Sequence, residues 1–448
     1  MAPTPPPPHV LIFPFPAQGH VNAMLKLTEL LLPAGLNITF LISAKDHRSL
    51  SGYANIHTRL NSFPGFQFHV IQGLYEGPLD SAEKLTIMFD CMSEKTTLLL
   101  RKLILDSPVT TCVIADGIMD FVLDAVEGTG VPVFSFRTIS GCAFWAYFSI
   151  PDLINSGELP FQGTNMDELI VNVKGMEGFL RRRDLPSFCR SGLSNRTLQQ
   201  VSRRIVSHIQ KHCSNIYTIG PLHAHLKSRS LNKSISSNSL FEEDKTCIGW
   251  LDQQPPKSVL YVSFGSIATL TRDQLMEFWY GLVNSKKRFL WVIRKDLVSK
   301  DDDKLPSELE NGTKERGYLV GWAPQEDVLA HPALGAFLTH NGWNSTLESI
   351  VAGIPMVSWP FFADQQINSR FVEAVWKLGI DMKDTCDRTT VERIVNEVME
   401  VRKDEFTESA KRMAKLAMES VSEGGTSYSN LDRLIQDIKT MGVQHEDE

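Results

Sequence analysis

The sequence predicts an α/β protein of two domains, each built on a parallel sheet. Its 448 residues exceed one ordinary hydrophobic core and fit two domains of about 200 residues each. Short apolar runs alternate with longer amphipathic stretches in the first half and again in the second, the pattern of repeated strand–helix–strand units. A serine-rich, charged stretch at residues 222–245 separates the two halves and predicts an interdomain linker.

The apolar runs define the expected elements in chain order. The first sheet is expected to contain residues 9–15, 37–43, 66–71, 112–116 and 132–136. The second sheet is expected to contain residues 258–266, 288–294, 317–322, 336–340 and 356–360. The last amphipathic run, residues 426–443, follows two glycines and predicts a single C-terminal helix.

Composition excludes several classes of protein. The formal charge of −7 is modest and the basic residues are scattered, so we expect no nucleic-acid partner. No window reaches the roughly 18 apolar residues of a membrane helix, and the N-terminal proline run is not a signal peptide. The 7 cysteines lack a CxxC pair and are typical of free thiols in a reducing compartment. We therefore expect a cytoplasmic monomer without a membrane span.

Two ionisable residues stand where strands of the first half end. His20 follows the first strand and Asp116 ends the fourth, and ligands of open α/β sheets bind at this edge. A histidine suits general-base chemistry because its pKa lies near neutrality, and a carboxylate beside it would fix its tautomer. A lone histidine is more often structural, and Asp120, one helical turn on, competes with Asp116. No dinucleotide-binding fingerprint follows the first strand, which argues against a nicotinamide enzyme.

Residues 322–365 contain aromatic side chains, side-chain amides, a histidine and the N-terminus of an expected helix. These are the groups needed to hold a nucleotide diphosphate sugar. Ser345 and Glu348 form an S-x-x-E pattern that by itself predicts a helix capping box. The N–H groups of such a helix start also suit phosphate. The tryptophans could be ordinary core residues, and Asp364 could simply be a helix N-cap.

The spacing within residues 322–365 closely resembles the donor box of plant secondary-product glycosyltransferases, the UDP-sugar-dependent family that glycosylates small molecules. The resemblance implies the GT-B fold, two Rossmann-like domains facing a cleft, with the C-terminal helix crossing back to the first domain. The domains are expected at 1–222 (acceptor-binding), 223–256 (linker), 257–425 (UDP-sugar-binding) and 426–448 (returning helix).

The resemblance also implies residue roles. His340, Asn344 and Ser345 would contact the diphosphate, Glu348 the ribose hydroxyls, and Asp364 with Gln365 the sugar, where the terminal glutamine favours glucose over galactose. The expected UDP-sugar site comprises Ser266, Trp322, Ala323, Gln325, His340, Trp343, Asn344, Ser345, Glu348, Asp364 and Gln365. Asn341 occupies a position that is often a cysteine in the family.

The implied reaction is inverting transfer of glucose from UDP-glucose to a hydroxyl or carboxyl of a lipophilic small molecule. His20 would be the general base, assisted by Asp116. Phe144 and Trp145 are expected to bind the acceptor, and residues 136–148 resemble members that act on terpenoids, especially iridoids. We expect no metal and no cofactor besides the donor substrate, because a helix start and His340 serve the leaving group. The acidic triplet Asp301–Asp303 is expected to be a solvated loop.

One departure from the family pattern concerns the first domain. A further apolar strand ending in N-T-F-x-x-L-E usually precedes the segment that here reads NIYTIGPL, and roughly 20 residues are expected to be absent. A shortened isoform that binds a UDP-sugar or a lipophilic ligand, with weak or no catalysis, is therefore the alternative. Release of UDP without an acceptor would indicate a third reading, a hydrolase.

Overall fold

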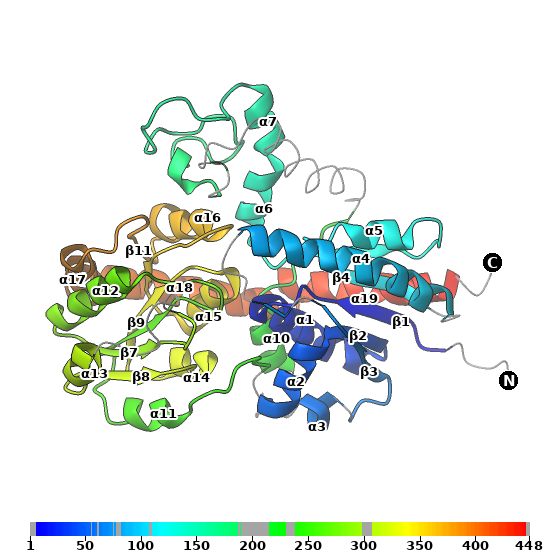
Figure 1. The fold of residues 1–448 in the computed structure, drawn as a ribbon, viewed down its shortest axis with the longest axis horizontal. Coiled ribbons are helices and arrows are strands. Elements are labelled where there is room, and N and C mark those ends of the chain that lie inside the picture. The colour runs from blue at the N-terminus through cyan, green and yellow to red at the C-terminus, as the bar shows by residue number, and fades with distance from the viewer. Residues whose placement is uncertain are drawn as a thin grey trace. The chain divides into compact units, whose positions relative to one another are not determined.

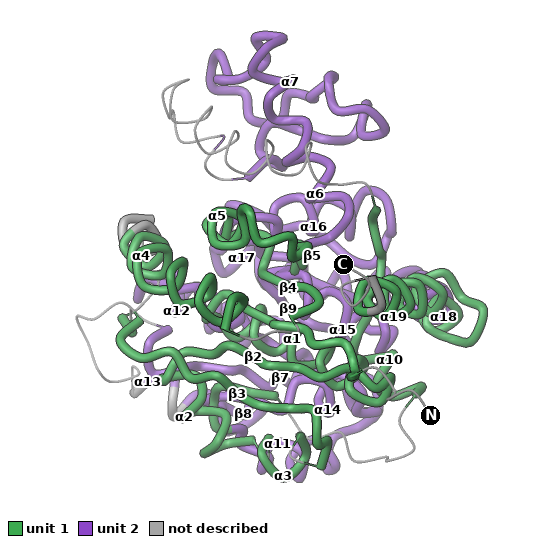
Figure 2. The backbone as a smooth tube through the Cα atoms, turned by 90° about the vertical axis from the view of Figure 1, so that its right-hand side faces the viewer, with its two compact units in different colours: residues 1–138, 213–242, 418–448 green, residues 139–212, 243–417 purple. Residues whose placement is uncertain are grey.

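The computed structural model describes residues 6–54, 56–60, 62–74, 76–77, 82–106, 110–186, 189, 215–229, 238–297 and 307–444. The chain forms two compact units, which Figure 2 colours separately. Unit 1 comprises residues 1–138, 213–242 and 418–448, and unit 2 comprises residues 139–212 and 243–417.

Unit 1 is built on a parallel sheet of five described strands in the order β3-β2-β1-β4-β5. The strands are β1 (His9–Phe13), β2 (Asn37–Ser43), β3 (Phe66–Ile71), β4 (Thr110–Asp116) and β5 (Val133–Phe136). Its helices are α1 (Gln18–Leu31), η1 (Leu32–Ala34), α2 (Ala44–Tyr53), α3 (Ile56–Leu60), α4 (Ala82–Asp106), α5 (Phe121–Val126), α10 (Leu222–Arg229) and α19 (Thr426–Gln444). The central strands are mostly apolar because both faces of a parallel sheet are covered.

The C-terminal helix belongs to the core of unit 1. Leu431, Leu434 and Ile438 of α19 are buried in the cluster that contains Val10 of β1, and α19 lies beside β4 in Figure 1. The predicted return of this helix to the first domain is confirmed.

Unit 2 is built on a second parallel sheet of six described strands in the order β11-β10-β9-β6-β7-β8. The strands are β6 (Val259–Ser263), β7 (Arg288–Val292), β8 (Gly317–Val320), β9 (Leu334–Thr339), β10 (Met356–Ser358) and β11 (Gly379–Asp381). Its helices are α6 (Gly141–Phe148), α7 (Ile150–Asn155), η2 (Arg182–Asp184), α11 (Thr246–Leu251), α12 (Arg272–Asn284), α13 (Ser307–Thr313), α14 (Gln325–Ala330), α15 (Trp343–Ala352), α16 (Gln365–Arg370), η3 (Phe371–Val375), α17 (Arg388–Asn396) and η4 (Glu397–Val401), and α18 (Lys403–Val421) runs from unit 2 into unit 1.

Residues 139–186 belong to unit 2, although the sheet that precedes them in the chain belongs to unit 1. Ala146 and Leu180 share one apolar cluster with Ile367 of α16 and Phe371 of η3. The compact units therefore divide the chain differently from the expected domains, whose bounds stay a prediction.

Two of the sequence expectations fall outside the described residues. The segment at 190–214, where a strand was expected to be absent, is one of them, and Asp301–Asp303 is the other. Among the helices that the structure does describe, none is long and apolar enough to cross a membrane.

Candidate active site

His20 and Asp116 are hydrogen-bonded in unit 1. His20 Nδ1 lies 2.6 Å from Asp116 Oδ2. The Asp116 side chain is 1% exposed, and that of His20 is 23% exposed. The amides of Phe15 and Ile118 also donate to the Asp116 carboxylate, at 3.4 and 3.3 Å. Because the carboxylate is a pure acceptor, Nδ1 carries the proton and Nε2 is left as the basic nitrogen.

Local structure explains why these two residues meet. β1 pairs in parallel with β4, with Phe13 opposite Ala115, so their carboxyl ends lie at the same edge. The chain leaves β1 through two prolines and enters α1, whose first turn holds His20. Asp116 ends β4. Asp120, the competing carboxylate, instead occupies the N-cap position of α5.

In unit 2, two glycines bring separate loops against the imidazole of His340. A Cβ on Gly265, in the turn after β6, would lie 2.5 Å from the ring, and a Cβ on Gly342 would lie equally close. Gly265 also has φ +73°, which favours glycine. Burial, together with the charge of Arg294, lowers the pKa of His340 to about 4. His340 is therefore neutral at physiological pH. Ser266 follows Gly265 directly in the chain.

The helix that follows His340 begins earlier than the S-x-x-E pattern predicts. α15 starts at Trp343 with Gly342 as N-cap, and no side chain among the described residues caps this end. The predicted capping box is wrong, because Ser345 already lies inside the first turn. The amides of Trp343, Asn344 and Ser345 precede the first helical hydrogen bond, so this end of the helix suits an anion.

Ser345 and Glu348 instead contact Gln325, the first residue of α14. Gln325 Nε2 donates to Ser345 Oγ at 2.9 Å and to Glu348 Oε2 at 2.7 Å. Tyr261 of β6 donates to Gln325 Oε1 at 3.3 Å. Trp322 precedes this helix and is half-buried, and the neighbouring Ala323 is buried. One polar cluster thus joins the ends of β8 and β9.

Asp364 and Gln365 lie at the start of α16. Asp364 occupies the N-cap position, but its carboxylate accepts a hydrogen bond from Asn368 Nδ2 at 2.7 Å and caps no amide. Asn368 also donates to the carbonyl of Asn341 at 3.0 Å and accepts from Ser140 at 2.7 Å. Gln365 Oε1 accepts from the amides of residues 361 and 362, so its amide nitrogen points away from that turn.

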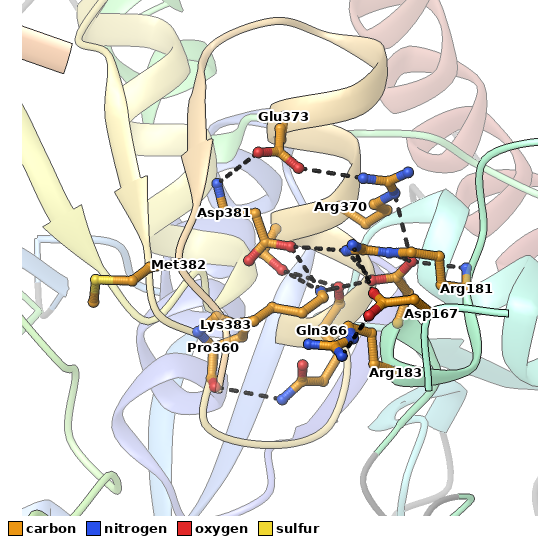
Figure 3. Close-up of polar contacts among 12 residues, drawn as sticks. Asp167, Arg181, Arg183, Pro360, Gln366, Arg370, Glu373, Asp381, Met382 and Lys383 are labelled. Carbon is orange, nitrogen blue, oxygen red and sulfur yellow. Dashed lines mark hydrogen bonds and ion pairs between the residues drawn. The ribbon is translucent and has the colours of Figure 1, made fainter. Parts of the chain in front are cut away.

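A buried ion cluster around Lys383 also holds α16 in place (Figure 3). Lys383 Nζ lies 2.8 Å from Asp184 and 2.9 Å from Asp381, and it donates to the carbonyl of Gln366 at 3.0 Å. Burial raises the pKa of Asp184, but the charge of Lys383 and hydrogen bonds from Arg181 and Lys383 outweigh it and hold that pKa below its ordinary value. The cluster therefore ties residues 181–184 to α16.

The aromatic residues expected to bind an acceptor lie on α6, in unit 2. Trp145 is 40% exposed, and Phe144 is half-buried. The Trp145 indole donates to the carbonyl of Lys174 at 2.8 Å and stacks on Phe148. Trp343 is also half-buried and lies beside Trp376, with ring centroids 6.3 Å apart.

The expected residues of the second half thus follow the carboxyl ends of β6, β8, β9 and β10. Sequence reasoning missed Asn368 and Arg294. A single charged residue ending the apolar run RFLWVIR was the available signal for Arg294. Over the described ranges, no three His, Cys, Asp or Glu side chains form a group that could hold a metal.

The sheets and these two groups of residues define a nucleotide-sugar-dependent glycosyltransferase of the GT-B fold. Residues 243–420 match the family model described as UDP-glucoronosyl and UDP-glucosyl transferase. A 7-deoxyloganetic acid glucosyl transferase of Catharanthus roseus is 51% identical, over 97% of this chain and 98% of the relative. The chain belongs to the UDP-glucuronosyl and UDP-glucosyl transferase family.

Two further comparisons agree. A myricetin 3-O-rhamnoside 1,2-glucosyltransferase of Crocosmia x crocosmiiflora is 42% identical, over 97% of this chain and 96% of the relative. The crystal structure of Os79 from O. sativa in complex with UDP superposes with a TM-score of 0.79 at 28% identity, covering 96% of this chain and 100% of Os79. Another Os79 structure contains U2F and a trichothecene.

Proposed function

We propose that this enzyme transfers glucose from UDP-glucose to a hydroxyl or carboxyl of a terpenoid, with inversion at the anomeric carbon. The observation that carries the mechanism is the contact of 2.6 Å between His20 Nδ1 and Asp116. It leaves Nε2 of His20 to take the acceptor proton, while Asp116 stabilises the imidazolium that forms. The acceptor oxygen then bonds to the anomeric carbon.

The leaving diphosphate is assigned to unit 2. Neutral His340, the turn carrying Ser266 and the start of α15, with Asn344 and Ser345, would receive the negative charge. Trp322 would stack on uracil, with Ala323 and Gln325 beside it, and Glu348 would hold the ribose. Asp364 and Gln365 would bind the glucose hydroxyls, with Trp343 nearby. This chemistry requires no metal or additional cofactor.

The acceptor class rests on the relatives. A second protein of Catharanthus roseus with 51% identity is also a 7-deoxyloganetic acid glucosyltransferase, and a Gardenia jasminoides relative with 37% identity is a 7-deoxyloganetin glucosyltransferase. We therefore place a cyclopentanoid monoterpene acid or alcohol first among acceptors, with phenolic compounds as the second class. Phe144 and Trp145 of α6 would provide apolar contacts. We further propose that the enzyme acts as a cytoplasmic monomer.

The test is incubation of the purified enzyme with UDP-glucose and a panel of such acceptors. Mass spectrometry should find one product heavier by a single hexosyl unit, with stoichiometric UDP. The alignment to the first relative spans 473 positions, more than the 448 residues of this chain, so part of that relative lies opposite gaps here. Binding of UDP without any hexosyl product would favour the alternative of a shortened, weakly active or non-catalytic binder.

A further inference from the structure

Arg294 is a buried arginine that follows β7 and holds the turn carrying Ser266. Its side chain is 4% exposed. Nη1 donates to the carbonyl of Gly265, and Nη2 donates to the carbonyl of Ala268 at 2.9 Å. One planar guanidinium therefore fixes both ends of the turn around Ser266, a geometry that the rigid fork of arginine favours.

The charge of Arg294 is only partly compensated. Nε lies 2.9 Å from Asp296 Oδ1, but the Asp296 side chain is 70% exposed and is hydrated. Burial lowers the pKa of Arg294 even though Asp296 acts to raise it. A buried cation whose counter-ion is exposed to solvent is incompletely neutralised, which favours the binding of an anion near the cation.

His340 lies close enough to Arg294 for that charge to lower the pKa of its imidazole. The Gly265 backbone, whose carbonyl Arg294 holds, packs directly against the His340 ring, and the N-cap of α15 packs against the same ring. The imidazole is neutral because burial and the charge of Arg294 both lower its pKa. The full positive charge beside this ring is therefore that of Arg294.

We propose that Arg294 is a positioning residue for the leaving group, which shapes the Gly265–Ala268 turn and directs its buried positive charge at the diphosphate. The inference rests on the proposed UDP site. During transfer the bond from the anomeric carbon to the β-phosphate oxygen breaks, and both of its electrons stay on that oxygen. The diphosphate thus gains negative charge, which a fixed buried cation stabilises more in the product than in the donor.

The experiment compares Arg294→Met with Asp296→Asn by calorimetric titration with UDP and with uridine, which lacks the phosphates. Arg294→Met should weaken UDP binding about 10- to 100-fold and uridine binding less than about threefold. Asp296→Asn removes the competing counter-charge, so UDP binding should stay within about twofold or become tighter. If the ion pair of Arg294 and Asp296 were purely structural, Asp296→Asn would instead weaken UDP binding.

Equal weakening of UDP and uridine by Arg294→Met would overturn the proposal, as would weakening of UDP by Asp296→Asn or no effect of Arg294→Met. If Arg294→Met does not fold, Arg294→Lys loses the rigid fork but keeps the positive charge. It should therefore retain the preference for UDP over uridine within about threefold, because that preference rests on the charge; loss of that preference would contradict the proposal. Failure of the wild-type enzyme to bind UDP would instead refute the proposed function.

Discussion

Replacing Asp116 with asparagine should lower turnover while leaving the fold and UDP binding intact. Proton transfer to His20 creates an imidazolium 2.6 Å from a carboxylate that is 1% exposed. Asparagine keeps the shape but removes that charge and can hold the wrong tautomer of the ring. A general base of this kind contributes about 10²–10⁴-fold, which corresponds to roughly 3–5 kcal/mol of activation free energy.

The assay is UDP release at saturating UDP-glucose and acceptor, with product measured by mass spectrometry. Asp120→Asn is the matched control, because Asp120 lies one helical turn after Asp116. Asp120 occupies the N-cap position of α5, but its side chain makes no capping hydrogen bond. We expect Asp120→Asn to keep turnover within about twofold, because the Asp120 side chain makes no capping hydrogen bond that the substitution would remove. Unchanged turnover in Asp116→Asn, or an equal loss in Asp120→Asn, would refute the assignment of Asp116.

Three further predictions concern the rest of the chain. Gly265→Ala places a methyl group 2.5 Å from the His340 ring in a residue with φ +73°. UDP affinity should therefore fall at least about tenfold, and the free energy of unfolding should fall by about 1–2 kcal/mol. Unchanged UDP binding in calorimetry would show that Gly265 is not needed beside His340. Lys383→Met leaves the carboxylates of Asp184 and Asp381 without the ammonium that contacts both. Urea denaturation should therefore show that the free energy of unfolding falls by about 3–5 kcal/mol. A fall under 1 kcal/mol would show that the cluster is not needed for stability. Burial, together with the charge of Arg229, lowers the pKa of His225 to about 4. The unfolded chain then binds the extra proton between pH 6.5 and 4, and stability falls as the pH drops through that window. His225→Asn should reduce the loss between pH 7 and pH 5 by roughly 2 kcal/mol, whereas an identical pH dependence in the variant would show that folding does not lower the pKa of His225.

The sheets could be predicted from the sequence because buried parallel strands are continuous apolar runs. All ten predicted runs contain or coincide with most of an observed strand. β11 was missed, since three residues, Gly379–Asp381, are too few to show a pattern. The meeting of His20 and Asp116 followed from their places at the ends of β1 and β4, which are neighbours in the sheet.

The contacts that orient the UDP-sugar residues could not be predicted. The S-x-x-E pattern placed the helix start at Ser345, but α15 already begins after Gly342, where a Cβ would lie 2.5 Å from the His340 ring. Gln325 bonds to Glu348 across two strand ends, a distance that no local pattern encodes. The hydrogen bonds of Asn368 to the Asn341 carbonyl and from Ser140 likewise depend on how α16 packs, and not on a local pattern.

The measurement that tests the account most directly is the mass of the product formed from UDP-glucose and a monoterpene acid by the wild-type enzyme and by His20→Ala. The account predicts an acceptor heavier by one hexosyl unit with the wild type, and turnover lowered about 10²–10⁴-fold in the variant. Calorimetry should find the same UDP affinity in both proteins. Equal turnover in the two proteins would contradict the role of His20, and UDP released without any glycosylated product would contradict sugar transfer itself.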